Sequence, residues 1–322
     1  MRKSLTKLLA VSILLMMVGN LVAQRVPSEV EHIEFLVTFG PGSTPSWGDD
    51  DHVQTFFFIT PETFTEPIYI RVYDPDIGGK HDEPNRNFNT RTRFSVYGGE
   101  GAHLNPDAQE IDPVGNYKSG QLLATKTFGS DTQYDQSWYS FGPFNPLEGE
   151  FSKKLGGYVF KVIAEGVSGN DGNLYRYFLS VSPNKNREVE GANAFTYEYS
   201  FRLPHDQKVV SHLYPFLDDD VVSITQFNFD FDKEGEILLY TIAKNRHLAR
   251  GSSNLAWASS KHKIVEEERN TTIDLQVLKS KNSRNDMVLY VKNQYDKAVP
   301  FFTVPIGGPP KYKYKVSLTY DN

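Results

Sequence analysis

Residues 195–203 read Phe195-Thr196-Tyr197-Glu198-Tyr199-Ser200-Phe201-Arg202-Leu203. Apolar and polar side chains alternate strictly, which is the period of a β-strand with two different faces. The same alternation recurs over residues 33–39 and 312–320. A sheet that packs one face on a core and leaves the other in water has this pattern. The chain is therefore predicted to be all-β and antiparallel.

Shorter strand-like runs fill the rest of the chain, separated by Gly, Pro, Asn and Asp, which predict turns. We expect strands near 53–60, 67–73, 92–97, 121–128, 137–142, 158–165, 174–182, 208–214, 221–231, 236–242, 272–278, 287–293 and 299–304. Residues 254–268 are ambiguous and would also fit a short helix. A break at Leu203-Pro204 divides the strands into two sets. We expect two tandem antiparallel β-sandwich domains, jelly-roll or immunoglobulin-like, at 24–204 and 205–322.

Residues 1–23 have the pattern of a cleavable secretory signal peptide. Three basic residues precede an apolar run over 8–18, and Ala23 offers a small residue for cleavage before Gln24. The run is shorter than the roughly 20 residues of a membrane-spanning helix, and an uncleaved amphipathic anchor is the alternative. No second long apolar stretch occurs. We therefore predict no transmembrane segment and an extracytoplasmic location, which includes secreted, periplasmic and cell-surface proteins.

The composition favours cations over nucleic acid as partners. The sequence has 34 Lys and Arg against 40 Asp and Glu, and loss of residues 1–23 would remove three basic residues and leave a net charge of −9. A chain this acidic is repelled by phosphate backbones, so we expect no nucleic-acid partner. Because there are no cysteines, stability must come from a large core or from bound ions.

The acids of the first expected domain differ between the two ends of its sandwich. If successive strands reverse direction, loops 41–52, 74–91, 129–136 and 166–173 meet at one end. This end carries mostly Asp, whereas the other end carries mostly Glu. The acids of the first end are Asp49, Asp50, Asp51, Asp74, Asp76, Asp82, Glu83, Asp131, Asp135 and Asp171.

Short Asp side chains can share an ion with nearby carbonyl groups, and calcium takes about six to eight oxygen ligands. We therefore predict that this end binds calcium. Asp74, Asp76 and Asp171 are the first expected ligands. Asp49 and Asp51 are the next. The alternative is that these residues are ordinary turn formers.

A second calcium candidate is Asp230-Phe231-Asp232-Lys233-Glu234-Gly235, which matches the opening of a D-x-D-x-acid-G loop. The later glutamate of an EF-hand is missing, since Thr241 stands at that position. The alternative is a β-hairpin turn with glycine at the bend.

One segment carries a resemblance to known proteins. Ile68-Tyr69-Ile70-Arg71-Val72-Tyr73-Asp74-Pro75-Asp76 resembles the strand and acidic turn of pre-peptidase C-terminal β-sandwich modules. Those modules accompany secreted enzymes and often carry calcium, so the resemblance implies a calcium-binding sandwich. The chain also resembles uncharacterised exported bacteroidete envelope proteins.

No motif of a known catalytic class occurs. The sequence lacks G-x-S-x-G, H-E-x-x-H and a phosphate-binding loop, and its eight histidines are scattered. We name no catalytic residue and expect a non-catalytic binding or structural module of the cell envelope, or a secreted one. Calcium would stabilise it, and its loops would face a protein or glycan partner. The alternative is a secreted carbohydrate-active enzyme that uses two loop carboxylates.

Overall fold

The computed structural model describes residues 25–45 and 48–313. The expected signal peptide and residues 314–320 of the last expected strand lie outside this part of the chain. The described chain is all-β, built from antiparallel sheets and four short 3-10 helices. The short helices are η1 (Glu29–Glu31), η3 (Pro106–Gln109), η4 (Pro146–Glu148) and η5 (Glu266–Glu268). In the described residues, no helix is long and apolar enough to span a membrane.

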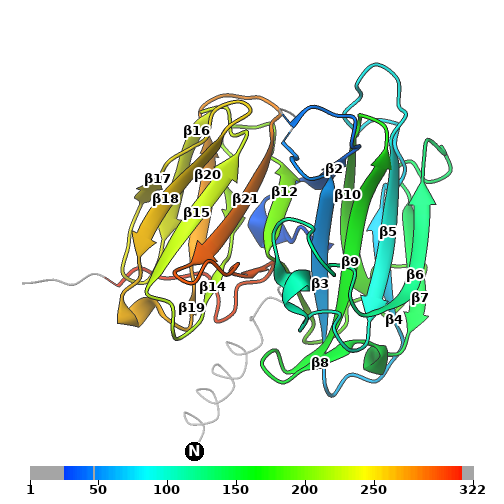
Figure 1. Ribbon diagram of the computed structural model, residues 1–322, viewed down its shortest axis with the longest axis horizontal. Helices are drawn as coiled ribbons and strands as arrows, with labels where there is room; N and C mark the ends of the chain where they lie inside the picture. Colours follow the sequence, from blue (N-terminus) through cyan, green and yellow to red (C-terminus); the bar gives the residue numbers. More distant parts are fainter. Residues whose placement is uncertain (1–24, 46–47, 314–322) are drawn as a thin grey trace, which may run out of the picture.

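One nine-stranded sheet runs through the whole molecule in the order β18-β15-β21-β12-β2-β10-β4-β7, with β1 beside β10 (Figure 1). Its strands are β1 (Arg25–Val26), β2 (Phe35–Phe39), β4 (Ile68–Tyr73), β7 (Trp138–Phe144), β10 (Gly172–Ser180), β12 (Glu198–Arg202), β15 (Ser223–Phe229), β18 (Trp257–Lys263) and β21 (Asp286–Asn293).

A seven-stranded sheet has the order β22-β11-β3-β9-β5-β6, with β8 beside β9. Its strands are β3 (Val53–Pro61), β5 (Arg91–Gly98), β6 (Gln121–Phe128), β8 (Glu150–Ser152), β9 (Gly157–Ser168), β11 (Asn193–Thr196) and β22 (Phe301–Phe302). A four-stranded sheet comprises β13 (Ser211–Leu213), β20 (Asp274–Lys279), β16 (Gly235–Tyr240) and β17 (His247–Ala249), and a two-stranded sheet comprises β14 (Phe216–Leu217) and β19 (Thr271–Thr272).

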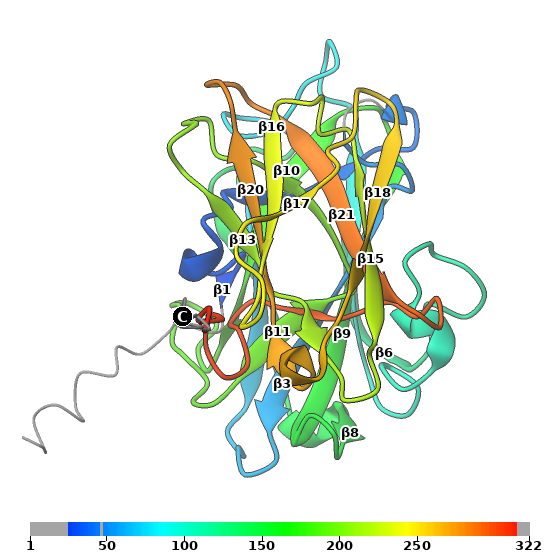
Figure 2. The same cartoon turned by 90° about the vertical axis from the view of Figure 1, so that its left-hand side faces the viewer.

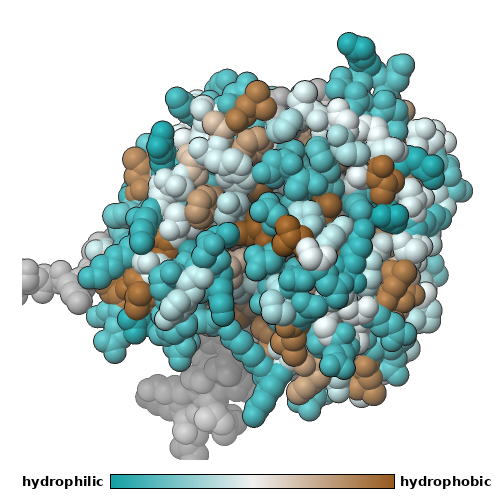
Figure 3. Space-filling model, in the orientation of Figure 1, coloured by the Kyte–Doolittle hydropathy of each residue, from teal (hydrophilic) through white to brown (hydrophobic). Residues whose placement is uncertain are grey.

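The sheets form two layers with apolar side chains between them. The seven-stranded sheet lies over the β2, β10 and β4 part of the long sheet, and the four-stranded sheet faces β15, β18 and β21 (Figures 1 and 2). One cluster of buried side chains extends through both parts, from Phe58 and Val162 to Leu239 and Leu289. The surface seen in Figure 3 is mostly polar, with small separate apolar areas.

The alternating stretch that predicts the fold does form strand, but it divides between two sheets. Residues 193–196 form β11 in the seven-stranded sheet, and residues 198–202 form β12 in the nine-stranded sheet. Three of its four polar side chains do not face water: Thr196, Ser200 and Arg202 are at most 4% exposed, whereas Glu198 is half-buried. The expected solvent face is therefore wrong here, because loops from elsewhere in the chain cover it. Ser200 Oγ donates to Gly48 O at 3.2 Å. Arg202 donates to His81 O at 3.2 Å.

The same pairing bears on the domain organisation. β12 precedes residue 204 and β21 follows it, yet the two strands are hydrogen-bonded neighbours. The all-β antiparallel prediction is confirmed, whereas the arrangement as two tandem jelly-roll or immunoglobulin-like domains is not. The division at residue 204 stays a prediction.

Residues 254–268 contain strand β18 and the single turn η5 rather than a longer helix. The strand pairs along its full length with β15, so cross-strand hydrogen bonds decide between the two structures that the local sequence allows.

Candidate functional site: an acidic end of the sandwich

The four Asp-rich loops meet at one end of the molecule, as the alternation of strand direction predicts. The 169–171 turn holds the loop after β2, since Gly40 N–H donates to Asp171 O and Gly42 N–H to Gly169 O, at 3.0 and 2.8 Å. The loop after β4 contacts the loop before β7, since Asp74 N–H donates to Ser137 O at 2.9 Å. These contacts come from strands far apart in the sequence, so the acids gather only in the folded chain.

In the loops after β4 and before β7, three carboxylate oxygens have no hydrogen-bond partner within the described part of the chain. They are Asp74 Oδ2, Asp76 Oδ1 and Asp135 Oδ1, and each is buried. Asp74 and Asp76 as whole residues are 0% and 2% exposed. None of the three acids pairs with a Lys, Arg or His within residues 25–45 and 48–313. Buried acceptors without a donor are costly and point to a missing partner.

The electrostatics of these acids agree with their burial. Desolvation raises the pKa of Asp74 to about 6; the hydrogen bond from Gln136 opposes this shift and the charge of Asp135 adds to it. Desolvation, followed by the charge of Asp74, raises the pKa of Asp76 to about 7. Near neutral pH, the negative charge of these carboxylates is neutralised either by a bound proton or by a cation.

Gly79 lets the chain pass close to Asp135. It has a φ of +71°, and a Cβ atom there would lie 2.0 Å from Asp135 Oδ1. Asp74 also adopts the left-handed region, with a φ of 56°, which Asp tolerates better than most residues. The local sequence Asp74-Pro75-Asp76 with Gly78-Gly79 therefore suits a tight loop that brings carboxylates near Asp135.

Two other acids of this end use their oxygens to hold the loops. Asp82 accepts the Leu174 N–H on Oδ1 and the Gly78 N–H on Oδ2, both at 2.7 Å. Asp171 accepts the Asn85 N–H on Oδ1 at 2.8 Å, and the Asn89 and Thr90 N–H groups on Oδ2 at 2.6 and 3.0 Å. The expected ligand Asp171 thus lies at the right end of the molecule, but its carboxylate already fixes loop 85–90.

Asp49, Asp50 and Asp51 form a second acidic group, in which one ligand oxygen from each lies within 4.8 Å of the others. Asp49 accepts the N–H groups of Phe39 and His52, so its oxygens are engaged. Asp51 Oδ2 is buried without a partner among the described residues.

The charges of this acidic group also act on Glu198 at the start of β12. Desolvation, then the charges of Asp51 and Asp50, raise the pKa of Glu198 well above its ordinary value. Desolvation and the charge of Asp49 likewise raise the pKa of Asp50 to about 6. The expected ligands Asp49 and Asp51 therefore lie in a different acidic group from the one around Asp74.

The Asp230–Gly235 candidate does not form a converging set of ligands. β15 and β16, which flank it, lie in different sheets, so the segment is also not a hairpin turn. Asp230 Oδ1 accepts the Leu255 N–H at 3.0 Å. Glu234 is paired with Lys281 at 2.7 Å. These acids hold the connection between the two layers.

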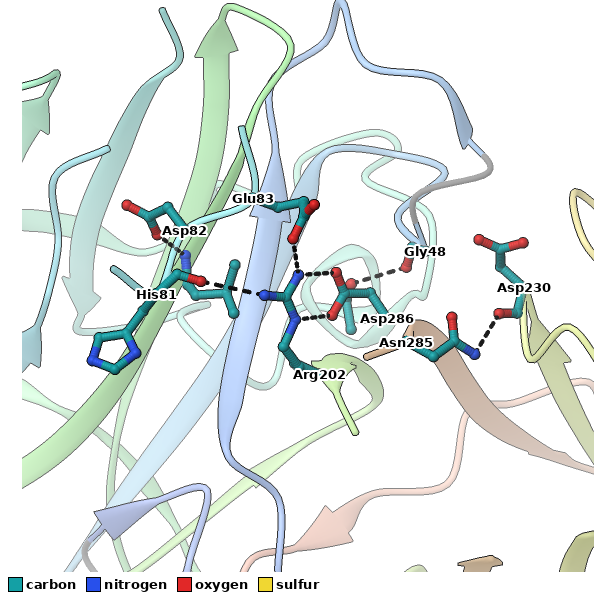
Figure 4. A network of polar contacts seen from close by, with 10 residues as sticks. Gly48, His81, Asp82, Glu83, Arg202, Asp230, Asn285 and Asp286 are labelled. Atoms are coloured by element: carbon teal, nitrogen blue, oxygen red, sulfur yellow. Dashed lines mark hydrogen bonds and ion pairs between the residues drawn. The ribbon is translucent and has the colours of Figure 1, made fainter. Parts of the chain in front are cut away.

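Arg202 ties the acidic end to the second half of the chain (Figure 4). Its guanidinium donates to both oxygens of Asp286, and to Glu83 Oε2 at 3.0 Å and His81 O at 3.2 Å. Asp286 is buried, and desolvation raises its pKa although Arg202 lowers it. The loop that carries Asp74 and Asp76 is therefore anchored at Glu83 by an ion pair with Arg202 of β12, which pairs in turn with Asp286 of β21.

Sequence reasoning missed two residues of this end. In the sequence, Asp135 looks no different from Asp131 of the same loop, and Glu198 occupies an ordinary polar position of an alternating strand. A comparison of the chain with protein-family models found no match, and a comparison with curated proteins found no match either.

Proposed function

We propose that this chain is an exported, non-catalytic binding or structural module whose acidic end takes a calcium ion on Asp74, Asp76 and Asp135. The observation that carries the proposal is the set of three buried carboxylate oxygens, which have no hydrogen-bond or ion-pair partner among the residues that the structure describes. Oxygen donors from Asp and backbone carbonyls are the ligands that calcium prefers. Calcium bound only to the folded state would stabilise it by about 2.7 kcal/mol at a hundredfold excess over Kd.

Thermal unfolding in calcium and in chelator tests this proposal. We expect calcium to raise the midpoint of the wild-type protein and to have no effect on the double variant Asp74→Asn/Asp76→Asn. Asp131→Asn, which changes an exposed acid of the same end, is the matched control and should keep the response. A midpoint that calcium does not move in the wild type would refute the site.

A cluster of aromatic side chains supports a glycan as the partner. Phe227, Tyr290 and Glu198 lie opposite one another across β15, β21 and β12. The rings of Phe227 and Tyr290 stack at 4.8 Å, and Trp257, 41% exposed, packs against Tyr290 at 5.2 Å. An aromatic face can pack on the apolar face of a sugar ring. The neighbouring Glu198, Asp50 and Asp51 can accept hydrogen bonds from its hydroxyl groups.

A glycan array with Trp257→Ala tests this surface. We expect binding to weaken about 5-fold, since stacked aromatic contacts are worth about 1 kcal/mol. Leu248→Ala, which removes a 63% exposed apolar side chain from β17, should leave binding unchanged. Turnover of a bound glycan that stops in Glu198→Gln would instead favour the carbohydrate-active enzyme. If the protein binds no glycan on the array, the proposed partner is a protein.

A further inference from the structure

Two histidines lie next to each other: His32, which ends η1, and His212 in β13. Their ring centroids are 5.5 Å apart and the rings are inclined by 74°. Two imidazoles on one tetrahedral zinc ion, with Zn–N bonds of about 2.0–2.1 Å, have ring centres about 5 Å apart. The spacing of this pair is therefore suited to a shared metal ion.

Each histidine has one ring nitrogen held by an oxygen acceptor. His32 Nδ1 lies 3.1 Å from Val210 O, and His212 Nδ1 lies 2.9 Å from Asp274 Oδ1. Because these oxygens can only accept, both Nδ1 atoms carry the hydrogen in the neutral rings. The lone pair is then on Nε2 in both residues. Neither Nε2 has a hydrogen-bond partner among the described residues.

The acceptor that orients His212 is itself fixed. Gln276 Nε2 donates to Asp274 Oδ2 at 2.8 Å, and Asp274 and Gln276 both belong to β20, the strand that pairs with β13. A histidine that binds a metal typically donates its other ring N–H to a carboxylate or carbonyl, and that carboxylate is in turn hydrogen-bonded. Both histidines of this pair, and Asp274 behind one of them, follow that arrangement.

We propose that His32 and His212 bind a transition-metal ion of the zinc class through their Nε2 atoms, with Asp274 as a positioning residue. Imidazole nitrogen suits zinc, copper and nickel, whereas the carboxylates of the acidic end suit calcium. The remaining coordination positions are open to water or to a ligand from a partner. This site is independent of the calcium site in its residues and in the chemistry of its ligands.

The ion would join two parts of the chain. η1 follows directly after β1 at the start of the described chain, whereas β13 belongs to the four-stranded sheet. Hydrogen bonds already connect them: Ser211 Oγ donates to His32 O at 3.2 Å, and Tyr214 Oη to Val30 O at 3.1 Å. The metal would reinforce this existing contact, so both ligands are preorganised before the ion binds.

Titration calorimetry of the full chain with zinc chloride, in excess calcium to fill the acidic end, tests the proposal. We expect one zinc ion per chain and a Kd at least about 10-fold weaker in His212→Ala and in His32→Asn. Asn is chosen because His32 has a φ of 51°, a left-handed conformation that Asn tolerates. Asp274→Asn should weaken binding about 10–100-fold, the range for residues that orient metal ligands.

Electron paramagnetic resonance spectra of bound copper(II) distinguish the loss of a metal ligand from a change in the surrounding structure. The wild-type protein should show coupling to two imidazole nitrogens, and His32→Asn should show coupling to one. His247→Ala is the matched control. His247 and His262 form another close pair, at 5.2 Å, but His262 is buried and no acceptor among the described residues orients its ring nitrogens. Zinc binding should therefore survive in this variant. Zinc binding that is lost in His247→Ala but kept in His212→Ala would overturn the assignment, as would a wild-type protein that binds no zinc.

Discussion

Arg202 lies directly opposite Asp286 in the β12–β21 pairing, and its guanidinium donates from Nε to Oδ1 at 2.8 Å and from Nη2 to Oδ2 at 2.7 Å. Both side chains are almost fully buried, at 5% and 7% exposure. A two-fold hydrogen-bonded ion pair of this kind satisfies charges that could not otherwise remain in the interior. It also joins strands on the two sides of residue 204, together with the loop that carries the candidate calcium ligands.

Arg202→Met should destabilise the protein by about 3–5 kcal/mol, because it leaves Asp286 buried without its partner. Urea unfolding at neutral pH measures the change. The double variant Arg202→Met/Asp286→Leu removes both charges and should recover a large part of the loss. A single variant as stable as the wild type would show that the pair is not needed.

The stability of the calcium-free protein should fall as pH rises from about 4 to 7. The pKa values of Asp74 and Asp76 are raised from 3.8 to about 6 and about 7, so the folded state holds more protons than the unfolded state between these values. Asp74 and Asp76 then make stability decrease with pH through this window. Saturating calcium, which binds the ionised carboxylates, should reduce the slope by the part that these two groups contribute. Unfolding midpoints across this pH range, in chelator and in calcium, measure both.

Gly79→Ala should abolish the stabilisation by calcium, whereas Gly78→Ala should not. Both glycines have positive φ, +147° at Gly78 and +71° at Gly79, so both substitutions strain the backbone. Only at Gly79 would the added Cβ meet Asp135, since nothing lies within 4 Å of a Cβ at Gly78. Comparing the calcium response of the two variants therefore isolates the contact with Asp135. Equal responses would mean that Asp135 is not a ligand.

Asp171→Ala should destabilise the protein by about 1–3 kcal/mol, the cost of a buried unsatisfied group, without abolishing its response to calcium. The substitution leaves the N–H groups of Asn85, Asn89 and Thr90 without their acceptor, and Thr90 is buried. Hydrogen exchange should show faster exchange in residues 85–90. Loss of the calcium response in an otherwise folded variant would restore Asp171 as a ligand.

The sequence by itself determined the all-β class and the positions of many strands. Alternation with a period of two depends only on which side chains each strand presents, so the expected ranges 121–128, 236–242 and 287–293 coincide closely with β6, β16 and β21. The reversal of successive strands also determined which loops share an end. Those loops meet through hydrogen bonds such as Thr90 N–H to Asp171.

The tertiary structure alone decided which faces are buried and which acids are free to bind an ion. Ser200 and Arg202 on the polar face of β12 are buried because the loops at Gly48 and His81 cover them, and local alternation contains no information about such neighbours. Asp171 and Asp74 have the same side chain and lie at the same end of the molecule. Three backbone N–H groups donate to the carboxylate of Asp171, whereas one carboxylate oxygen of Asp74 has no partner among the described residues. That difference arises from hydrogen bonds between loops distant in sequence, which exist only once the chain has folded.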